Sequence, residues 1–134
     1  MNQTVIRPIA PNEIEAVRRL LVETGWAHRV GDSARFSELV RRSTIALVAV
    51  ADQEPVGFVR ALSDGLSNGY VSMLTVAPGW RQRGIGRALV KAVLASGDED
   101  MTWVLRAGRE HAPVFFARFG FTPSQEAMER KRQV

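Results

Sequence analysis

Apolar residues recur in the first part of the chain at the interval typical of helices. Residues 5–9 form a short apolar stretch that predicts an opening strand, and the helical spacing begins soon after it. Asn12, with Glu15 three positions later, predicts a capping box at the start of this helix, and Gly25 predicts its end. A second short helix is expected from Ser33. The positions of the first helix that face the core are expected to be Ile14, Val17, Leu20, Leu21 and Thr24.

The middle of the chain has the apolar, β-branched pattern of buried strands. Residues 44–51 and 56–62 are two such runs, and the polar residues 52–55 between them predict a hairpin turn. Residues 63–69 contain the pairs Asp-Gly and Asn-Gly, which favour turns, and residues 70–76 form the next run. The pattern predicts three consecutive antiparallel strands.

Helical spacing returns after the third of these strands. The strand over residues 70–76 leads through a glycine-containing loop into an amphipathic helix that ends near Gly97, and residues 101–106 read as a buried strand. Strand, helix and strand predict a parallel crossover. A short helix is expected at 113–118, and residues 121–132 are expected to supply one or two edge strands. The apolar face of the long helix consists of Ile85, Ala88, Leu89, Ala92 and Val93.

Length and composition restrict the class of protein. The chain has 134 residues, of which 46% are hydrophobic and 24% are charged, so we expect one globular domain over residues 1–134. No apolar run reaches the roughly 20 residues of a membrane-spanning helix, and the first ten residues lack a signal-peptide pattern, so a cytoplasmic location is expected. The lack of cysteine excludes disulfides, cysteine ligands to a metal and a cysteine nucleophile. The two histidines give little basis for a metal site.

The charged residues indicate a function in the segment where arginines and glycines lie close together. The formal net charge is +4, and 16 of the 18 basic residues are arginine, which alone does not distinguish a nucleic acid from an anionic cofactor. Arg81, Arg83 and Arg87 lie with Gly84 and Gly86 between a predicted strand and a predicted helix. Glycines let main-chain N–H groups approach an anion, and a helix start carries unpaired donors. The segment therefore predicts a pyrophosphate site.

Two common phosphate-binding motifs do not fit this segment. A P-loop needs G-x-x-x-x-G-K-[ST], and a Rossmann motif needs a third small residue where Leu89 stands. With its flanks, the segment Gln82-Arg83-Gly84-Ile85-Gly86 resembles the acetyl-CoA motif of the GNAT N-acetyltransferase superfamily, and Ala112, Phe115-Phe116 and Gly120-Phe121 resemble the family's late helix. The resemblance implies an α/β, single-domain GNAT fold, with a mixed central sheet of six to seven strands, a splayed βαβ cofactor site and about four helices.

The same resemblance implies acetyl-CoA as co-substrate. In the family, the strand that matches residues 70–76 is bulged and splays from the next strand, so that pantetheine inserts between the two. Main-chain groups of this strand bind the pantetheine, and main-chain donors at the following helix start bind the pyrophosphate. The cofactor-binding residues that the resemblance implies here are Leu74, Thr75, Val76, Arg81, Gln82, Arg83, Gly84, Ile85, Gly86, Arg87 and Phe116.

The sequence departs from the family at two positions that bear on catalysis. Phe116 stands where a tyrosine often serves as the acid for the departing thiolate, and Arg109 stands where asparagine is frequent. Tyr70 is the only tyrosine of the chain. It is a candidate general acid, or a base that acts through water, and a tyrosine packed at a strand end is the alternative interpretation.

The acceptor side of the site is expected to lie along the same strand. Ser72 is expected to share a strand face with Tyr70 and Leu74, because side chains alternate with a period of two. Arg106 lies inside an apolar strand, where it either lines the substrate side or pairs with an acid such as Asp64. The substrate-side candidates are Ser72, Asn68 and Arg106.

These features predict transfer of an acetyl group from acetyl-CoA to a primary amine of a small molecule or a peptide. Because the chain has no cysteine, we expect direct attack in a ternary complex. The alternative is a catalytically weak acyl-CoA-binding or sensor domain, which Phe116 favours. No metal and no membrane partner is expected, and nucleic acid is not favoured because the arginines are dispersed. A terminal strand near Met128 would favour a homodimer.

Overall fold

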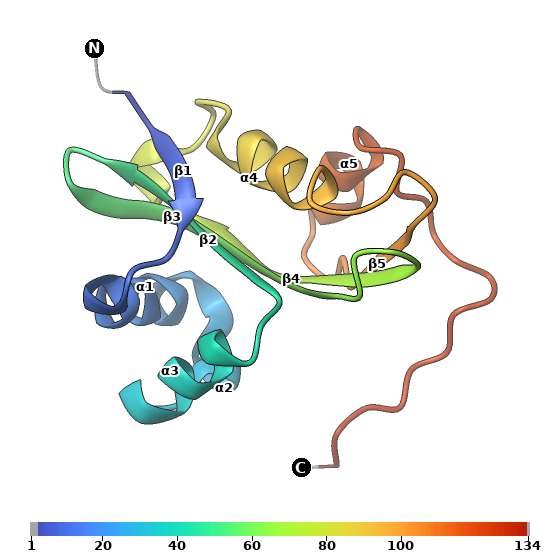
Figure 1. Ribbon diagram of the computed structural model, residues 1–134, viewed down its shortest axis with the longest axis horizontal. Helices are drawn as coiled ribbons and strands as arrows, with labels where there is room; N and C mark the ends of the chain where they lie inside the picture. Colours follow the sequence, from blue (N-terminus) through green and yellow to red (C-terminus); the bar gives the residue numbers. More distant parts are fainter. Residues whose placement is uncertain (1–2, 134) are drawn as a thin grey trace.

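A five-stranded sheet forms the centre of the computed structural model, which describes residues 3–133 (Figure 1). Neighbouring strands from β1 to β4 are antiparallel, and β5 is parallel to β4. The predicted hairpins and the parallel crossover are therefore confirmed. In chain order, which is also their order in the sheet, the strands are β1 (Val5–Pro8), β2 (Ile45–Ala51), β3 (Glu54–Ser63), β4 (Asn68–Val76) and β5 (Thr102–Leu105).

Helices cover both faces of this sheet (Figure 1). One face carries α1 (Ile14–Leu21), η2 (Val22–Trp26), α2 (Ala27–Val30) and α3 (Ser33–Arg41), and the other carries α4 (Ile85–Leu94) with α5 (Ala112–Ala117) beside it. The short 3-10 turns η1 (Pro11–Glu13) and η3 (Pro78–Trp80) precede α1 and α4. Because α1, η2 and α2 form one kinked helix, the described residues contain four helical bodies, as expected.

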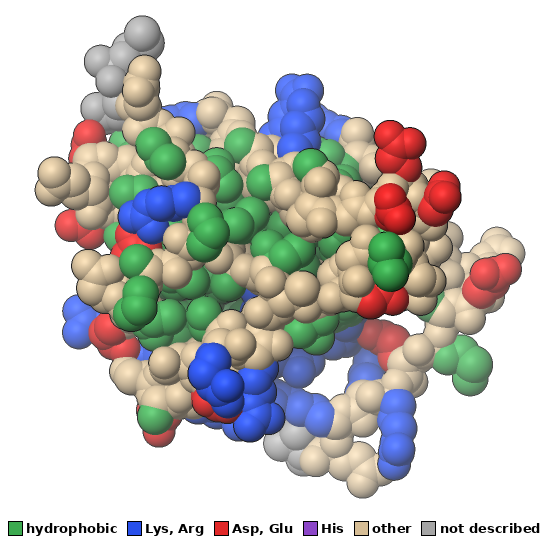
Figure 2. Space-filling view, viewed as in Figure 1, with side chains coloured by type: hydrophobic (Ala, Val, Ile, Leu, Met, Phe, Trp, Pro, Cys, Tyr) green, Lys and Arg blue, Asp and Glu red, His purple; other side chains and the backbone are tan. Residues whose placement is uncertain are grey.

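The described part of the chain forms five strands, so the expectation of six to seven strands is wrong. Residues 121–133, which were expected to supply one or two edge strands, contain none. After Phe121 this tail has only Pro123, Ala127 and Met128 as apolar residues, so pairing along the sheet edge would bury little apolar surface. Figure 2 shows the tail running apart from the body, with Lys and Arg side chains around the opening that it encloses. A homodimer stays a prediction, without the terminal strand at Met128 that favoured it.

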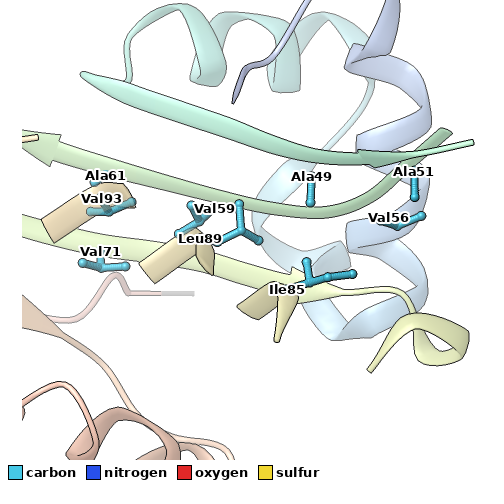
Figure 3. Close-up of a cluster of buried hydrophobic side chains, with 9 residues drawn as sticks. All are labelled: Ala49, Ala51, Val56, Val59, Ala61, Val71, Ile85, Leu89 and Val93. Carbon is cyan, nitrogen blue, oxygen red and sulfur yellow. The ribbon is translucent and has the colours of Figure 1, made fainter. Parts of the chain in front are cut away.

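Two apolar clusters hold the helices to the sheet, one on each face. Side chains alternate between them along β3, where Phe58 faces α1 and α3 and Val59 faces α4. Figure 3 shows the second cluster, in which Ile85, Leu89 and Val93 of α4 lie against the sheet. Ile85, Leu89 and Val93 are therefore used for packing, which leaves the N-terminus and the outer face of α4 for other roles.

The first helix begins and ends differently from the prediction. Glu13, and not Glu15, caps its start, because Glu13 Oε1 accepts a hydrogen bond from the main-chain N–H of Ala10 at 2.8 Å. Arg7 pairs with the same carboxylate at 2.6 Å. Gly25 lies at φ 98° inside the helix and produces a kink, after which the chain continues into α2. This kink lies next to the functional site.

Candidate active site

The pairing between β4 and β5 covers only the first part of β4. Their parallel pairing runs from Asn68 and Thr102 to Val71 and Leu105, and it stops there. Residues 72–76 therefore have a strand neighbour on the β3 side alone. Main-chain groups on the open side of this segment are not used by a ladder, so they are available to a ligand. The pairing stops because β5 ends at Leu105, so the expected splay between the two strands stays a prediction.

A β-bulge in β4 determines which face of the sheet each of its side chains takes. The register with β3 shifts by one residue beside Met73, which lies at φ 57°. Leu74 packs in the cluster beneath α4, as Val71 does. Ser72 and Tyr70 alternate with Val71 and lie on the opposite face. The prediction that Ser72, Tyr70 and Leu74 share one face is therefore wrong, because the period of two does not continue across a bulge.

The start of α4 forms an open concave turn. Gln82 and Gly84 lie at φ 64° and 83°, and Gly84 is the N-cap residue of the helix. No side chain caps this end, so the first N–H groups of the helix have no intrahelical or side-chain partner among the described residues. A Cβ at Gly84 would meet no atom within 4 Å. The turn thus presents unpaired donors and the positive end of a ten-residue helix to open space.

Three arginines surround this turn with different contacts. Arg81 Nε donates to the main-chain oxygen of Val76 at 3.1 Å, so this side chain occupies one of the groups expected to bind pantetheine. The guanidinium of Arg83 lies over the ring of Trp80, with 4.7 Å to the ring centroid. Arg87 is exposed in the first turn of α4. Their charges add to the helix dipole, which makes the turn suited to a phosphate group.

Two of the expected cofactor residues direct their side chains away from the turn. Thr75 is 6% exposed, and its hydroxyl donates to Thr24 Oγ1 on the α1 side of the sheet at 2.8 Å. Ile85 packs into the cluster between α4 and the sheet. Only the main chain of these two residues is available to a ligand. Gly86 lies against α5, because a Cβ there would lie 3.4 Å from the Phe115 ring.

Phe116 lies in an aromatic group formed by α5 and the residues after it. Its ring meets those of Phe115 and Phe121 edge to face, with centroids 5.0 and 5.8 Å apart. Phe116 also lines a hollow of about 1440 Å³ that follows the outer edge of β5 and reaches Tyr70 and Val104. The structure therefore brings Phe116 and Tyr70 to one hollow, and α5 contributes a hydrocarbon ring without a proton to donate.

The three substrate-side candidates lie at separate places. Ser72 lies beside the bulge, whereas Asn68 begins β4, six residues and roughly 20 Å from Leu74 along an extended strand. Arg106 pairs with Glu129 of the tail at 2.6 Å, and the alternative pair with Asp64 is not formed. The Asp64 carboxylate instead accepts three main-chain N–H groups of its own turn, which lower its pKa from the usual value.

Arg60 is a candidate that sequence reasoning missed. It lies in β3 opposite Ser72, so it shares the face of Ser72 and Tyr70, and it is 8% exposed. Its Nε donates to Ser43 Oγ at 2.8 Å. The signal was present in the sequence, because Arg60 is the single charged residue in the apolar run 56–62. A lone charge in a strand that is otherwise buried merits a search for its partner.

Arg109, which stands where asparagine is frequent in the family, links the segment after β5 to the kink of the first helix. Its guanidinium lies over the Trp26 ring, with 4.7 Å to the centroid, and its Nη1 donates to the main-chain oxygen of Thr24 at 2.6 Å. Gly25 leaves room for it, since a Cβ there would lie 3.1 Å from Arg109 Nη2. The segment after β5 is thereby joined to the kink of the first helix. The departure from the family's asparagine was its sequence signal.

Residues 3–133 contain no cluster of three potential metal ligands and no long apolar helix. No three His, Cys, Asp or Glu side chains lie close enough together there to hold a metal ion. No helix of this part of the chain has the length and apolar character needed to cross a membrane.

Comparison with known proteins agrees with this geometry. Residues 42–123 match the model of the acetyltransferase (GNAT) domain. The uncharacterized N-acetyltransferase YafP of Escherichia coli strain K12 is 32% identical over 107 residues, which cover 79% of this chain. The matched region spans 63% of the length of YafP.

Solved structures extend the similarity over nearly the whole chain. A protein assigned to the GNAT family from Xanthomonas campestris pv. campestris has a TM-score of 0.79 and 27% identity, with 98% of this chain and 95% of that chain covered. The GNAT family acetyltransferase SP0256 of Streptococcus pneumoniae TIGR4 has the same fold, with a TM-score of 0.76, 23% identity, and 99% and 100% of the two chains covered. With its partly unpaired strand β4, open helix start and matching domain model, the chain belongs to the GNAT acetyltransferase family, a family of acyltransferases.

Proposed function

We propose that the protein transfers an acetyl group from acetyl-CoA to a primary amine of a small molecule or a peptide, by direct attack in a ternary complex. The observation that carries this proposal is the open N-terminus of α4 next to the part of β4 that does not pair with β5. A strand without a ladder and a helix start without a cap both offer main-chain hydrogen-bonding groups, and acetyl-CoA is a ligand with amides and a pyrophosphate to use them.

The residues present fit acetyl-CoA in charge and in shape. Main-chain N–H groups from Gln82 to Arg87 would hold the pyrophosphate, and the exposed guanidinium groups of Arg83 and Arg87 would add charge-assisted hydrogen bonds. Main-chain groups of Leu74 and Val76 would bind the pantetheine amides, for which Arg81 has to release the Val76 oxygen. The ligand supplies an acetyl group activated as a thioester.

The protein's own contribution to the reaction is to position the acetyl group, to shield the site from water and to exchange protons. Main-chain donors at the bulge near Leu74 would polarise the acetyl carbonyl. Phe116 cannot donate a proton, so it would shield the site from water. Tyr70 lies four residues from Leu74, roughly 13 Å along an extended strand, so we assign its hydroxyl a role through water and not in direct contact.

The proposal is tested by titrating acetyl-CoA into the protein in a calorimeter at low salt. Arg87→Glu is expected to raise the dissociation constant at least tenfold, because it places a negative charge beside the pyrophosphate. Arg35→Glu is the matched control, since Arg35 is exposed on α3 across the sheet, and it should change the constant less than twofold. No binding, or an equal loss in both variants, would contradict the proposal. A tryptophan at Gly86 is a poorer probe because its Cβ would already touch Phe115.

A second candidate function is an acyl-CoA-binding or sensor domain with weak catalysis, and the hydrocarbon ring of Phe116 is the observation that favours it. The two functions differ in turnover. Release of free thiol from acetyl-CoA in the presence of a panel of primary amines supports the transferase. Tight binding of acetyl-CoA without thiol release from any amine supports the sensor.

A further inference from the structure

Arg60 is a buried guanidinium on the side of the sheet that faces away from α4. Its neighbours along β3, Val59 and Ala61, both pack beneath α4, so Arg60 takes the opposite face. In register it lies between Ala46 of β2 and Ser72 of β4. It is the only arginine or lysine of the described residues that is classed as buried.

No carboxylate of residues 3–133 forms an ion pair with Arg60. Its one side-chain hydrogen bond is from Nε to Ser43 Oγ at 2.8 Å, and the Ser43 hydroxyl in turn donates to the main-chain oxygen of Leu39 at 2.8 Å. Nη1 and Nη2 donate to no described residue, and neither is sealed from solvent. One edge of the guanidinium is thus fixed in place, while its other donors remain open.

This arrangement carries an electrostatic cost that an anion would offset. Burial lowers the pKa of the Arg60 guanidinium, and the nearby phenol of Tyr70 opposes this change only in part. A buried charge without a counter-charge is unfavourable, and an apolar residue of similar size is often tolerated better at such a position. A guanidinium with its terminal donors open matches the two oxygens of a carboxylate or a phosphate.

Arg60 is also close to the place where acetyl transfer is proposed. Its partner in register is Ser72, and the bulge at Met73 and Leu74 lies two residues farther along β4, a main-chain step of roughly 7 Å. Tyr70, on the same face, lines the hollow that leads past β5.

We propose that Arg60 binds a carboxylate or phosphate group of the acceptor, so that the preferred acceptors are primary amines with an anionic group. This inference rests on the proposed acetyltransferase function. Arg60 is assigned to recognition of the acceptor and not to the chemical step. Ser43 is a positioning residue that holds the guanidinium through Nε.

The test uses matched acceptors, each an ω-amino carboxylate, an ω-amino phosphate or an ω-amino alcohol of the same chain length. For the wild-type protein, kcat/KM from thiol release is expected to be at least tenfold higher for the carboxylate or the phosphate series than for the alcohol. The series with the higher kcat/KM shows whether Arg60 binds a carboxylate or a phosphate. Arg60→Met should abolish this preference while the acetyl-CoA dissociation constant stays within twofold. Equal kcat/KM for charged and neutral acceptors in the wild type, or an unchanged preference in Arg60→Met, would overturn the proposal.

Two further measurements keep the outcome decisive. If Arg60→Met does not fold, Arg60→Lys replaces it, because lysine keeps the positive charge but loses the planar pair of guanidinium donors. The KM of Arg60→Lys should then rise at least threefold for the anionic acceptors and not for the alcohol. An equal rise in KM for the alcohol overturns the proposal. If no acceptor gives thiol release, the proposed function fails, and thermal shift with the same amines tests Arg60 separately. The anionic amines should then raise the Tm of the wild type and of the control Arg35→Met but not of Arg60→Met, and equal shifts in all three overturn the assignment.

Discussion

A pair of buried threonines ties the kinked first helix to the strand that carries the bulge. Thr75 Oγ1 donates to Thr24 Oγ1 at 2.8 Å, and Thr24 Oγ1 donates to the main-chain oxygen of Leu20 at 2.8 Å. The two residues are 6% and 9% exposed, so water does not replace these bonds when one partner is lost. We therefore expect strongly non-additive effects when the two hydroxyls are removed singly and together.

The expected magnitudes follow from which group each substitution leaves unpaired. Thr75→Val removes a donor, while the Thr24 hydroxyl keeps its bond to Leu20, so the loss in unfolding free energy should be about 1 kcal/mol. Thr24→Val leaves the Thr75 hydroxyl buried without an acceptor, which costs up to about 3 kcal/mol. The double variant has no orphaned hydroxyl, so its loss should fall about 1–2 kcal/mol short of the sum of the two single losses.

Urea unfolding followed by tryptophan fluorescence measures these differences. Thr122→Val, in the exposed tail, is the matched control and should change the unfolding free energy by no more than about 0.5 kcal/mol. Single losses that add to the double loss within about 0.5 kcal/mol would refute the reasoning, because the two hydroxyls would then not depend on each other.

Two further predictions concern stability. Gly69→Ala should destabilise the fold by about 1–3 kcal/mol, since its Cβ would lie 2.4 Å from Trp103 ring atoms, whereas the control Gly79→Ala, with no atom within 4 Å, should change thermal unfolding little. Arg7 lowers the pKa of Glu13 below the reference value of 4.5, so the ionised carboxylate stabilises the fold above that pH, and the contribution is lost as the pH falls through the folded-state pKa. Glu13→Gln should cost about 1 kcal/mol at pH 7 and flatten the acid side of a pH–stability curve; an unchanged acid side would contradict this.

Much of the fold was predictable because the relevant signals are local. The β-branched runs that became β2, β3 and β4 are separated by turn residues with a strong conformational preference, and the helix over Ile85–Leu94 directly follows Gly84, its N-cap residue. This glycine made the open turn predictable, since a positive φ and a close main-chain approach both favour glycine. Signals of this kind do not depend on distant parts of the chain.

Other features depend on contacts that a single sequence does not reveal. The resemblance predicts a bulge in this strand but not its position, and nothing at Met73 marks a positive φ, so the face of Leu74 was assigned wrongly. Glu13, and not Glu15, caps the first helix because Arg7 of β1 holds the Glu13 carboxylate in place. The tail has too few apolar residues for its path to be predicted from the sequence. The ion pair between Glu129 of the tail and Arg106 is seen only in the structure.

The bulge also explains how one strand can serve two substrates. With an unbroken period of two, Ser72 and Leu74 would face the same layer. The extra residue at Met73 instead leaves Tyr70 and Ser72 on the side of Arg60, and it directs Leu74 to the side of α4. The proposed donor and acceptor therefore approach from opposite faces and meet where β4 has no neighbour, so neither has to displace the other for a ternary complex to form.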